Sequence, residues 1–155
     1  MARSRGSRGG DGSEVRLGVT LALTFLAASC SGATPPEASL VDVVAVEYEF
    51  VGVPSQLPAG ETTFVIRNDG GEGHDFILGR MLREDAEVPE VIEVPQSERE
   101  LLFRQSAETV IVEPGDTARL SVDVTEGRYA YLCLTTTEAG RTHAYHGMWG
   151  EVSVA

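Results

Sequence analysis

The chain has 155 residues and a formal net charge of −12, with 24 acidic residues against 12 basic ones, all of them arginine. This length fits one domain. The acidic balance argues against binding to nucleic acid or to anionic lipid headgroups, because such partners would be repelled. An acidic surface can steer a basic partner, but a solvated exterior is the expected role of most of these residues.

The N-terminal part of the chain has the pattern of an export signal. Four arginines lie within residues 1–16, and the mostly apolar residues 17–28 are too few for a membrane-spanning helix. The apolar run ends in "LAASC", which resembles the lipobox of bacterial lipoproteins, where the cysteine becomes lipidated. We predict a signal peptide over residues 1–29, lipid attachment at Cys30 and a low-complexity tether over residues 30–40. The alternative is an ordinary signal peptide cut nearby, with Cys30 left as a plain thiol.

Residues 41–155 are expected to form one all-β domain. Short runs rich in valine, threonine, tyrosine and isoleucine alternate with glycine, proline and aspartate, which is typical of an antiparallel β-sandwich of about seven strands. In chain order, the predicted strands lie at residues 40–50, 61–69 and 74–81, twice within 108–124 around a Pro-Gly-Asp turn, and at 128–134 and 150–154.

The segment 82–107 interrupts the strand pattern. It is acidic, contains two prolines and has a partly helical spacing of apolar residues. We predict an inserted excursion with one short helix near residues 97–105. Ser97 is the expected N-cap, with Glu100 completing a capping box.

Soft metal ligands gather near the C-terminus, in the stretch "YLCLTTTEAGRTHAYHGMW", which contains Cys133, His143, His146 and Met148. With Cys30 lipidated, Cys133 would be unpaired in an oxidising compartment, where a bound metal is the obvious occupant of a thiol. A disulfide between the two cysteines is the alternative, and it would join a flexible tether to the domain.

A third histidine, His74, opens a predicted strand directly after the glycine-rich "NDGGEG". In an antiparallel sandwich, the start of one strand and the end of its neighbour lie at the same pole, so His74 can meet the loop that carries Cys133, His143 and Met148. One thiolate, two imidazoles and a weak thioether are the ligands of blue copper sites. Singly, each residue fits a surface or core role. The gathering of all three histidines near one pole favours copper.

The stretches "NDGGEGHDF" and "YLCLTTTEAGRTHAYHGM" together resemble the paired motifs of the cupredoxins, the superfamily of plastocyanin and azurin, and in particular its secreted bacterial branch. The resemblance covers the whole predicted domain and implies a Greek-key β-sandwich with a mononuclear copper site. The roles that it implies are upstream imidazole for His74, thiolate for Cys133, second imidazole for His143, axial thioether for Met148, and a bracing residue that does not bind copper for Asn68.

One feature departs from the small electron carriers of this superfamily. Nine residues separate Cys133 from His143, which is a longer spacing than usual, and the longer loop is expected to leave the metal more exposed. His146 is an alternative ligand, but it lies only two residues from Met148. Extended residues two apart point the same way and rarely converge on one small ion. We therefore place His143 ahead of His146.

Enzyme chemistry is not expected. Leu132 and Leu134 flank Cys133 where multicopper oxidases place histidines, and a single cysteine in the domain excludes a binuclear copper centre. A Cys–His nucleophile would leave His74 and Met148 without a role.

The predicted function is that of an exported, lipid-anchored monomer that binds one copper ion and transfers single electrons. It would act at the outer face of the cell membrane or in the periplasm, with an extracytoplasmic or membrane redox protein as partner. Two alternatives remain: carriage of Cu(I) for delivery to another protein, and a metal-free β-sandwich used for protein interaction.

Overall fold

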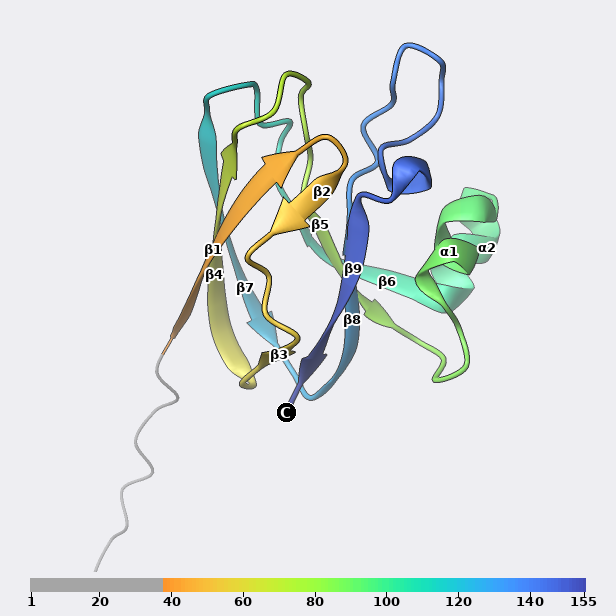
Figure 1. The fold of residues 1–155 in the computed structure, drawn as a ribbon. Coiled ribbons are helices and arrows are strands. Elements are labelled where there is room, and N and C mark those ends of the chain that lie inside the picture. The colour runs from red at the N-terminus through yellow and green to blue at the C-terminus, as the bar shows by residue number, and fades with distance from the viewer. Residues whose placement is uncertain (1–37) are drawn as a thin grey trace, which may run out of the picture. The chain divides into compact units, whose positions relative to one another are not determined.

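The computed structural model describes residues 38–155, which fold into two β-sheets packed face to face (Figure 1). Its strands are β1 (Ser39–Val46), β2 (Glu49–Val51), β3 (Gln56–Leu57), β4 (Gly60–Asn68), β5 (Ile77–Met81), β6 (Phe103–Glu108), β7 (Thr117–Val124), β8 (Gly127–Leu132) and β9 (Trp149–Val154).

The first sheet has the strand order β2-β1-β4-β7, and the second has the order β3-β9-β8-β5-β6. Most neighbours are antiparallel as expected, but β1 runs parallel to β4 and β3 runs parallel to β9. The predicted all-β sandwich is confirmed. The structure has more strands than the seven or so that we expected, because it includes β2 and β3, which are only three and two residues long.

Several predicted strands differ in extent from those observed. The strand predicted at 74–81 begins only at Ile77, so His74 does not open it but lies on the turn before it, in an isolated bridge with Val112. Residues 40–50 form a hairpin of β1 and β2 rather than one strand. The apolar run at 109–112 is not a strand, and Val110 and Ile111 are 82% and 54% exposed. Here the chain leaves β6 in the second sheet and crosses to β7 in the first. Tertiary connectivity therefore overrides the β propensity of this run.

Strand β8 and Cys133, the residue that follows it, contribute alternate side chains to two hydrophobic clusters. Tyr129, Tyr131 and Cys133 pack into the core between the sheets. Ala130 and Leu132 belong to a separate cluster with the two helices. Successive strand residues point to opposite faces, so the alternation along β8 directs Cys133 inward.

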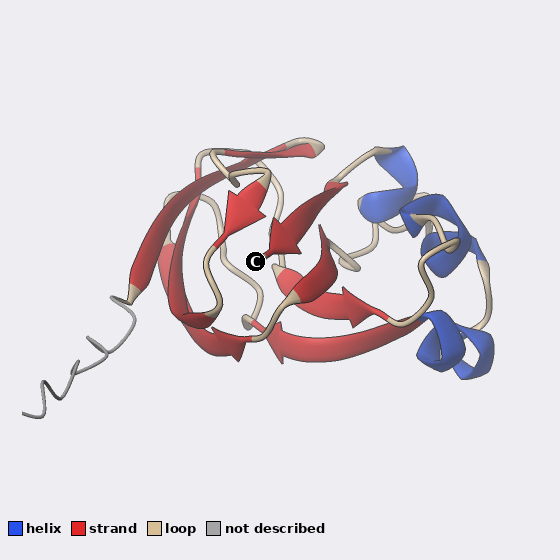
Figure 2. Cartoon of the chain, turned by 90° about the horizontal axis from the view of Figure 1, so that it is seen from below, coloured by secondary structure: helices blue, strands red, loops and turns tan. Residues whose placement is uncertain are grey.

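The excursion between β5 and β6 contains two helices, α1 (Val88–Glu93) and α2 (Gln96–Leu102), which lie to one side of the sandwich against the second sheet (Figure 2). The prediction of a single helix near 97–105 is therefore wrong in number and extent. Pro95, not Ser97, is the N-cap of α2, and no side-chain cap forms. The carbonyl of Pro95 accepts hydrogen bonds from the backbone N–H groups of Glu98 and Arg99 at 3.0 and 2.9 Å.

Helix α2 ends at Leu102 because the next residue, Phe103, begins strand β6 and packs against β5. The ring of Phe103 packs directly over Gly79 of β5, where a side chain on the glycine would collide with it. Phe103 is only 6% exposed, and it begins β6 opposite Met81.

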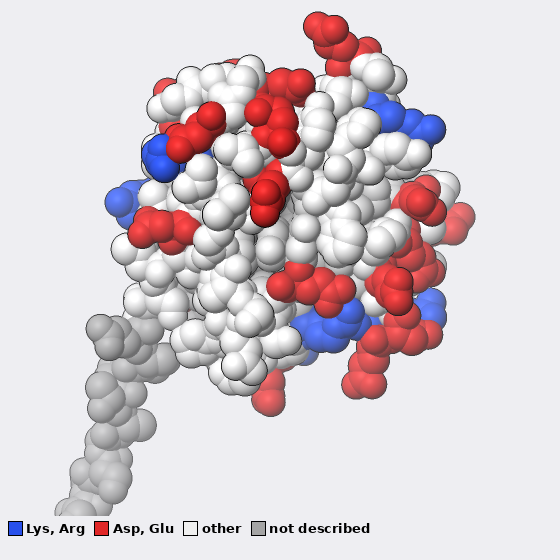
Figure 3. All heavy atoms as spheres, viewed as in Figure 1, with Lys and Arg blue, Asp and Glu red and all other residues white. Residues whose placement is uncertain are grey.

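Acidic side chains form separate groups on the face seen in Figure 3, several of them over the helical excursion and others toward the end of the sandwich that carries the β1–β2 turn. Several arginines on the surface pair with neighbouring carboxylates, such as Arg83 with Asp85 and Arg128 with Glu151. The acidic excess of the sequence therefore lies on the surface of the domain.

The predicted signal peptide, Cys30 and residues 30–37 of the predicted tether lie outside the described residues. Strand β1 begins at Ser39, two residues before the predicted start of the domain. Within residues 38–155, neither helix is long and apolar enough to cross a membrane.

Candidate metal centre

Three side chains from distant parts of the chain meet at the end of the sandwich where the β1–β2, β4–β5 and β8–β9 connections lie (Figure 1). The Nδ1 atoms of His74 and His143 are 3.0 Å apart. The Sγ atom of Cys133 lies 3.5 Å from Nδ1 of His143 and 4.0 Å from Nδ1 of His74. All three residues are 0% exposed. The structure thus brings together three of the four predicted ligands, with their donor atoms facing one another.

Met148, the fourth predicted ligand, is also fully buried and packs in the same core cluster as Cys133. The backbone N–H of Cys133 donates to the carbonyl of Met148 at 3.1 Å, and the N–H of Met148 donates to the carbonyl of His143 at 3.1 Å. These bonds hold Met148 at the same end of the core as the other three residues.

The long loop between Cys133 and His143 closes on itself. Thr136 and Thr142 form an isolated β-bridge, so the residues between them make a small hairpin. Behind it, the N–H of His143 donates to the carbonyl of Thr135 at 2.8 Å, and the N–H of Ala144 donates to that of Cys133 at 2.9 Å. The expectation that the long loop would expose the site is therefore wrong. The extra residues project away, and the side chains of Cys133 and His143 stay fully buried.

Backbone and side-chain hydrogen bonds fix the turn that carries His74. His74 pairs with Val112 on the segment that crosses between the sheets. Asn68, the predicted bracing residue, is fully buried. Its Nδ2 donates to the carbonyls of Glu72 and Val112 at 2.7 and 2.8 Å, and its Oδ1 accepts from the N–H of Gly70 at 2.8 Å. One buried amide thus ties the glycine-rich turn to the crossing segment.

His146 lies outside the cluster. It is exposed and is the last residue of the short 3-10 helix η1 (Ala144–His146). Its ring stacks on the ring of Tyr48 with a centroid distance of 4.9 Å. The geometry therefore places His143, and not His146, beside Cys133.

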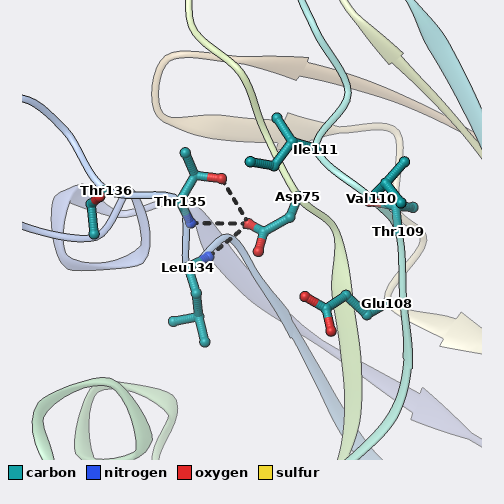
Figure 4. Close-up of a pocket in the computed structure, with 8 residues that line it drawn as sticks. All are labelled: Asp75, Glu108, Thr109, Val110, Ile111, Leu134, Thr135 and Thr136. Atoms are coloured by element: carbon teal, nitrogen blue, oxygen red, sulfur yellow. Dashed lines mark hydrogen bonds between the residues drawn. The ribbon is translucent and has the colours of Figure 1, made fainter.

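Asp75 is a bracing residue that the sequence analysis missed. It is 8% exposed, and its Oδ1 accepts hydrogen bonds from the N–H groups of Leu134 and Thr135 at 2.8 and 3.1 Å and from the Thr135 hydroxyl at 3.3 Å (Figure 4). The residue after His74 thereby holds the residues that follow Cys133. Its position next to a predicted ligand was the only signal for it in the sequence.

Two carboxylates that the sequence analysis also missed lie behind the histidine rings. Glu47 Oε1 is 3.3 Å from Nε2 of His74, and Glu72 Oε2 is 3.0 Å from Nε2 of His143. Burial of Glu47 raises its pKa, but hydrogen bonds from the N–H groups of Glu72 and Gly71 outweigh this and leave the pKa below its ordinary value. Glu47 is therefore a carboxylate at neutral pH.

The pKa shifts keep Cys133 and His74 uncharged in the absence of a metal. Burial raises the pKa of the Cys133 thiol to about 12, and the nearby Asp75 carboxylate adds to this effect. Burial also lowers the pKa of His74, and the neighbouring His143 lowers it further. The site thus holds a thiol and a neutral imidazole, and a bound cation would have to displace the thiol proton.

The donor set determines which ions the centre can hold. A thiolate and two imidazoles in a dry, buried position suit soft or borderline ions such as copper and zinc. Magnesium and calcium prefer oxygen ligands. Met148 adds a thioether, a donor that favours Cu(I).

The fold is a cupredoxin-type sandwich of two packed sheets. The candidate donors lie on the turn before β5, directly after β8, and on the loop that leads to β9. Solved structures of blue copper proteins share this fold, which confirms the predicted fold class. No protein-family model and no curated protein matches the sequence.

Three solved structures illustrate the likeness. Auracyanin A, a "blue" copper protein from Chloroflexus aurantiacus, is 20% identical with a TM-score of 0.55, over 77% of this chain and 100% of the other. The auracyanin of Roseiflexus castenholzii is 19% identical with a TM-score of 0.53, over 76% and 97% of the two chains. The azurin Az-iso2 of Methylomonas sp. strain J is 17% identical with a TM-score of 0.51, over 76% and 98%. At these identities, the likeness concerns the fold.

Proposed function

We propose that the protein binds one copper ion and transfers single electrons. His74, Cys133 and His143 would supply the three strong ligands, and Met148 would supply a weak axial one. The observation that carries this proposal is the convergence of two imidazole Nδ1 atoms and one thiol within 4.8 Å of one another, all fully buried. Two imidazoles, a thiolate and a thioether are the ligand set of blue copper electron-transfer sites.

Copper in such a site supplies a one-electron couple between Cu(I) and Cu(II). The chain's own residues would bind the ion and resist rearrangement when its charge changes. Asp75 and Asn68 support this role, because their hydrogen bonds fix the two segments that would carry the ligands. The dry surroundings of Cys133 would exclude water from the thiolate.

Electron transfer fits the burial of the site better than delivery of Cu(I) does. A carrier that releases its ion to an acceptor needs at least one ligand within reach of that acceptor, whereas Cys133 and both histidines are fully buried. A metal-free interaction module fits less well, because a core gains nothing from two imidazoles whose Nε2 atoms lack hydrogen bonds.

The setting of this function is also a proposal. We infer that the protein is exported and held at the outer face of the cell membrane by a lipid on Cys30. There it would act as a monomeric carrier and not as an enzyme. The acidic surface in Figure 3 supports a partner with a basic docking face on an extracytoplasmic or membrane redox protein. Cys30→Ser is expected to release the protein from the membrane fraction. Continued membrane association would contradict the anchor.

The function is tested by adding Cu(II) to the purified protein and recording visible absorption and electron paramagnetic resonance. We expect one intense thiolate-to-copper band that saturates at one equivalent and disappears in Cys133→Ser. His146→Ala is the matched control, because this histidine lies outside the cluster, and it should keep the band. Weak, colourless binding that is the same in wild type and Cys133→Ser would refute the proposal.

A further inference from the structure

The two histidine rings direct their Nδ1 atoms toward the thiol, so each must place its remaining proton elsewhere when a metal is bound. A neutral imidazole carries one proton, and a ring that ligates through Nδ1 carries it on Nε2. The Nε2 atoms of His74 and His143 are buried and have no hydrogen bond in this structure. Because a buried N–H without an acceptor is costly, the metal-bound state needs an acceptor at each Nε2.

The polar atoms at hand are the carboxylate oxygens of Glu47 and Glu72, one behind each ring. Both lie within hydrogen-bond distance of the Nε2 atoms, but off the direction of a good bond. A change in the orientation of the ring or of the carboxylate would align each pair for a hydrogen bond. Each predicted imidazole ligand thus has its own acidic neighbour.

The carboxylate of Glu47 is held in place by the glycine-rich turn. Its Oε1 accepts hydrogen bonds from the N–H groups of Gly71 and Glu72, both at 2.7 Å. A side chain at Gly70 would collide with this carboxylate, so glycine at that position leaves the room that Glu47 occupies. The turn before His74 is therefore shaped around an acid from the β1–β2 connection.

Hydrogen bonds join Glu72 to Glu47 and to Tyr48. Its N–H binds Glu47, and its Oε1 lies 3.5 Å from the hydroxyl of Tyr48, which donates to it. The Tyr48 ring also meets the ring of His143 edge-on, with a centroid distance of 5.0 Å. The Glu72 side chain is 47% exposed, so Tyr48 and the turn restrict a carboxylate that solvent can reach.

We propose that Glu47 and Glu72 are positioning residues that accept the Nε2 protons of His74 and His143 in the metal-bound protein and bias the site toward Cu(II). This inference rests on the proposed copper site. Carboxylate acceptors orient metal-bound imidazoles and increase their basicity as ligands. Cu(II) carries one more positive charge than Cu(I), so two anionic neighbours stabilise it more strongly.

The test replaces each acid by its neutral isostere in the full chain. Glu47→Gln keeps the oxygen that accepts from Gly71 and Glu72, which protects the turn, and Glu72→Gln removes the second charge. Glu113→Gln is the matched control, because Glu113 is an exposed acid beside the crossing segment, near Gly73 of the same turn. Affinities for Cu(II) and Cu(I) are measured by competition with chelators, and the potential by redox titration.

Mutation of such an acceptor commonly weakens metal binding by about 10- to 100-fold. Each glutamine variant keeps an oxygen that can accept the Nε2 proton and removes the negative charge that strengthens the bond. We expect Cu(II) affinity to fall within this range in each variant and Cu(I) affinity to fall less. A tenfold change in their ratio corresponds to a rise of about 59 mV in the one-electron potential. The Nε2–H signals of both histidines should be visible by NMR in the Cu(I) protein and should move in the variant of the facing acid.

The outcomes separate this inference from the proposed function. If wild type gives the thiolate-to-copper band but Glu47→Gln and Glu72→Gln shift the ratio no more than Glu113→Gln, the carboxylate role is overturned and the copper site stands. If wild type binds no copper through Cys133, both are overturned.

Discussion

Replacement of Asp75 by alanine is expected to destabilise the copper-free protein by an amount that follows from its hydrogen bonds. Asp75→Ala removes the acceptor of the Leu134 and Thr135 N–H groups and of the Thr135 hydroxyl. The hydroxyl can turn toward water in the adjoining surface pocket, but the two backbone donors are held by the loop (Figure 4). A buried donor left without a partner costs about 1–3 kcal/mol.

Two such donors give an expected loss of about 2–4 kcal/mol in the free energy of unfolding, after allowance for partial access of water. Small domains have roughly 5–15 kcal/mol in total, so the loss is a large fraction of the stability. Urea denaturation measures it: with a slope of about 2 kcal/mol per molar, the midpoint should fall by about 1–2 M.

Asp75→Asn is the control, because its amide oxygen can still accept both backbone hydrogen bonds. Its cost should stay at about 1 kcal/mol, the difference between a charged and a neutral acceptor. If Asp75→Ala is no less stable than Asp75→Asn, these hydrogen bonds do not hold the loop, and the reasoning is refuted.

Three further predictions follow from the site. The free energy of unfolding of the copper-free protein should be highest below pH 9 and fall by about 1.4 kcal/mol per pH unit between pH 9 and 12. The folded state keeps the Cys133 thiol protonated because burial raises its pKa to about 12, whereas the unfolded thiol ionises near 9.0. Urea titrations across pH measure this fall, and Cys133→Ser should flatten it. Replacement of residues 137–141 by Asn-Gly should change copper affinity by less than about tenfold. The hydrogen bonds from His143 to Thr135 and from Ala144 to Cys133 lie outside the replaced residues, so they should remain. Loss of the visible band would show that the hairpin itself shapes the site. Free copper at about 100 times the dissociation constant should raise the free energy of unfolding by about 2.7 kcal/mol, a gain that a chelator reverses and that Cys133→Ser lacks.

The positions of the candidate ligands could be predicted because they depend on short-range patterns. Alternation along "YAYLCL" directs Cys133 to the same side as Tyr129 and Tyr131, and the core cluster contains all three. The glycine-rich turn before His74 and the spacing from His143 to Met148 are likewise visible in the sequence. The order of these residues was enough to indicate a common pole.

The surroundings of the ligands could not be predicted in the same way. Glu47 reaches the turn at Gly71 across 24 residues of sequence, and Asp75 reaches Leu134 across 59. Both contacts depend on how the β1–β2 hairpin and the loop after β8 fold back, which no local pattern encodes. The start of β6 at Phe103 is a similar case, because it depends on the space above Gly79.

The sharing of β8 between two clusters links the thiol to a part of the molecule that supplies none of the proposed ligands. Leu132 packs behind the sheet with Val88 and Val91 of α1, and the next residue, Cys133, faces the opposite way. Close-packed interiors transmit strain instead of absorbing it. The helical excursion therefore packs behind the strand that leads to Cys133, and we expect a change of volume at Val91 to shift the sulfur while the two sheets stay paired.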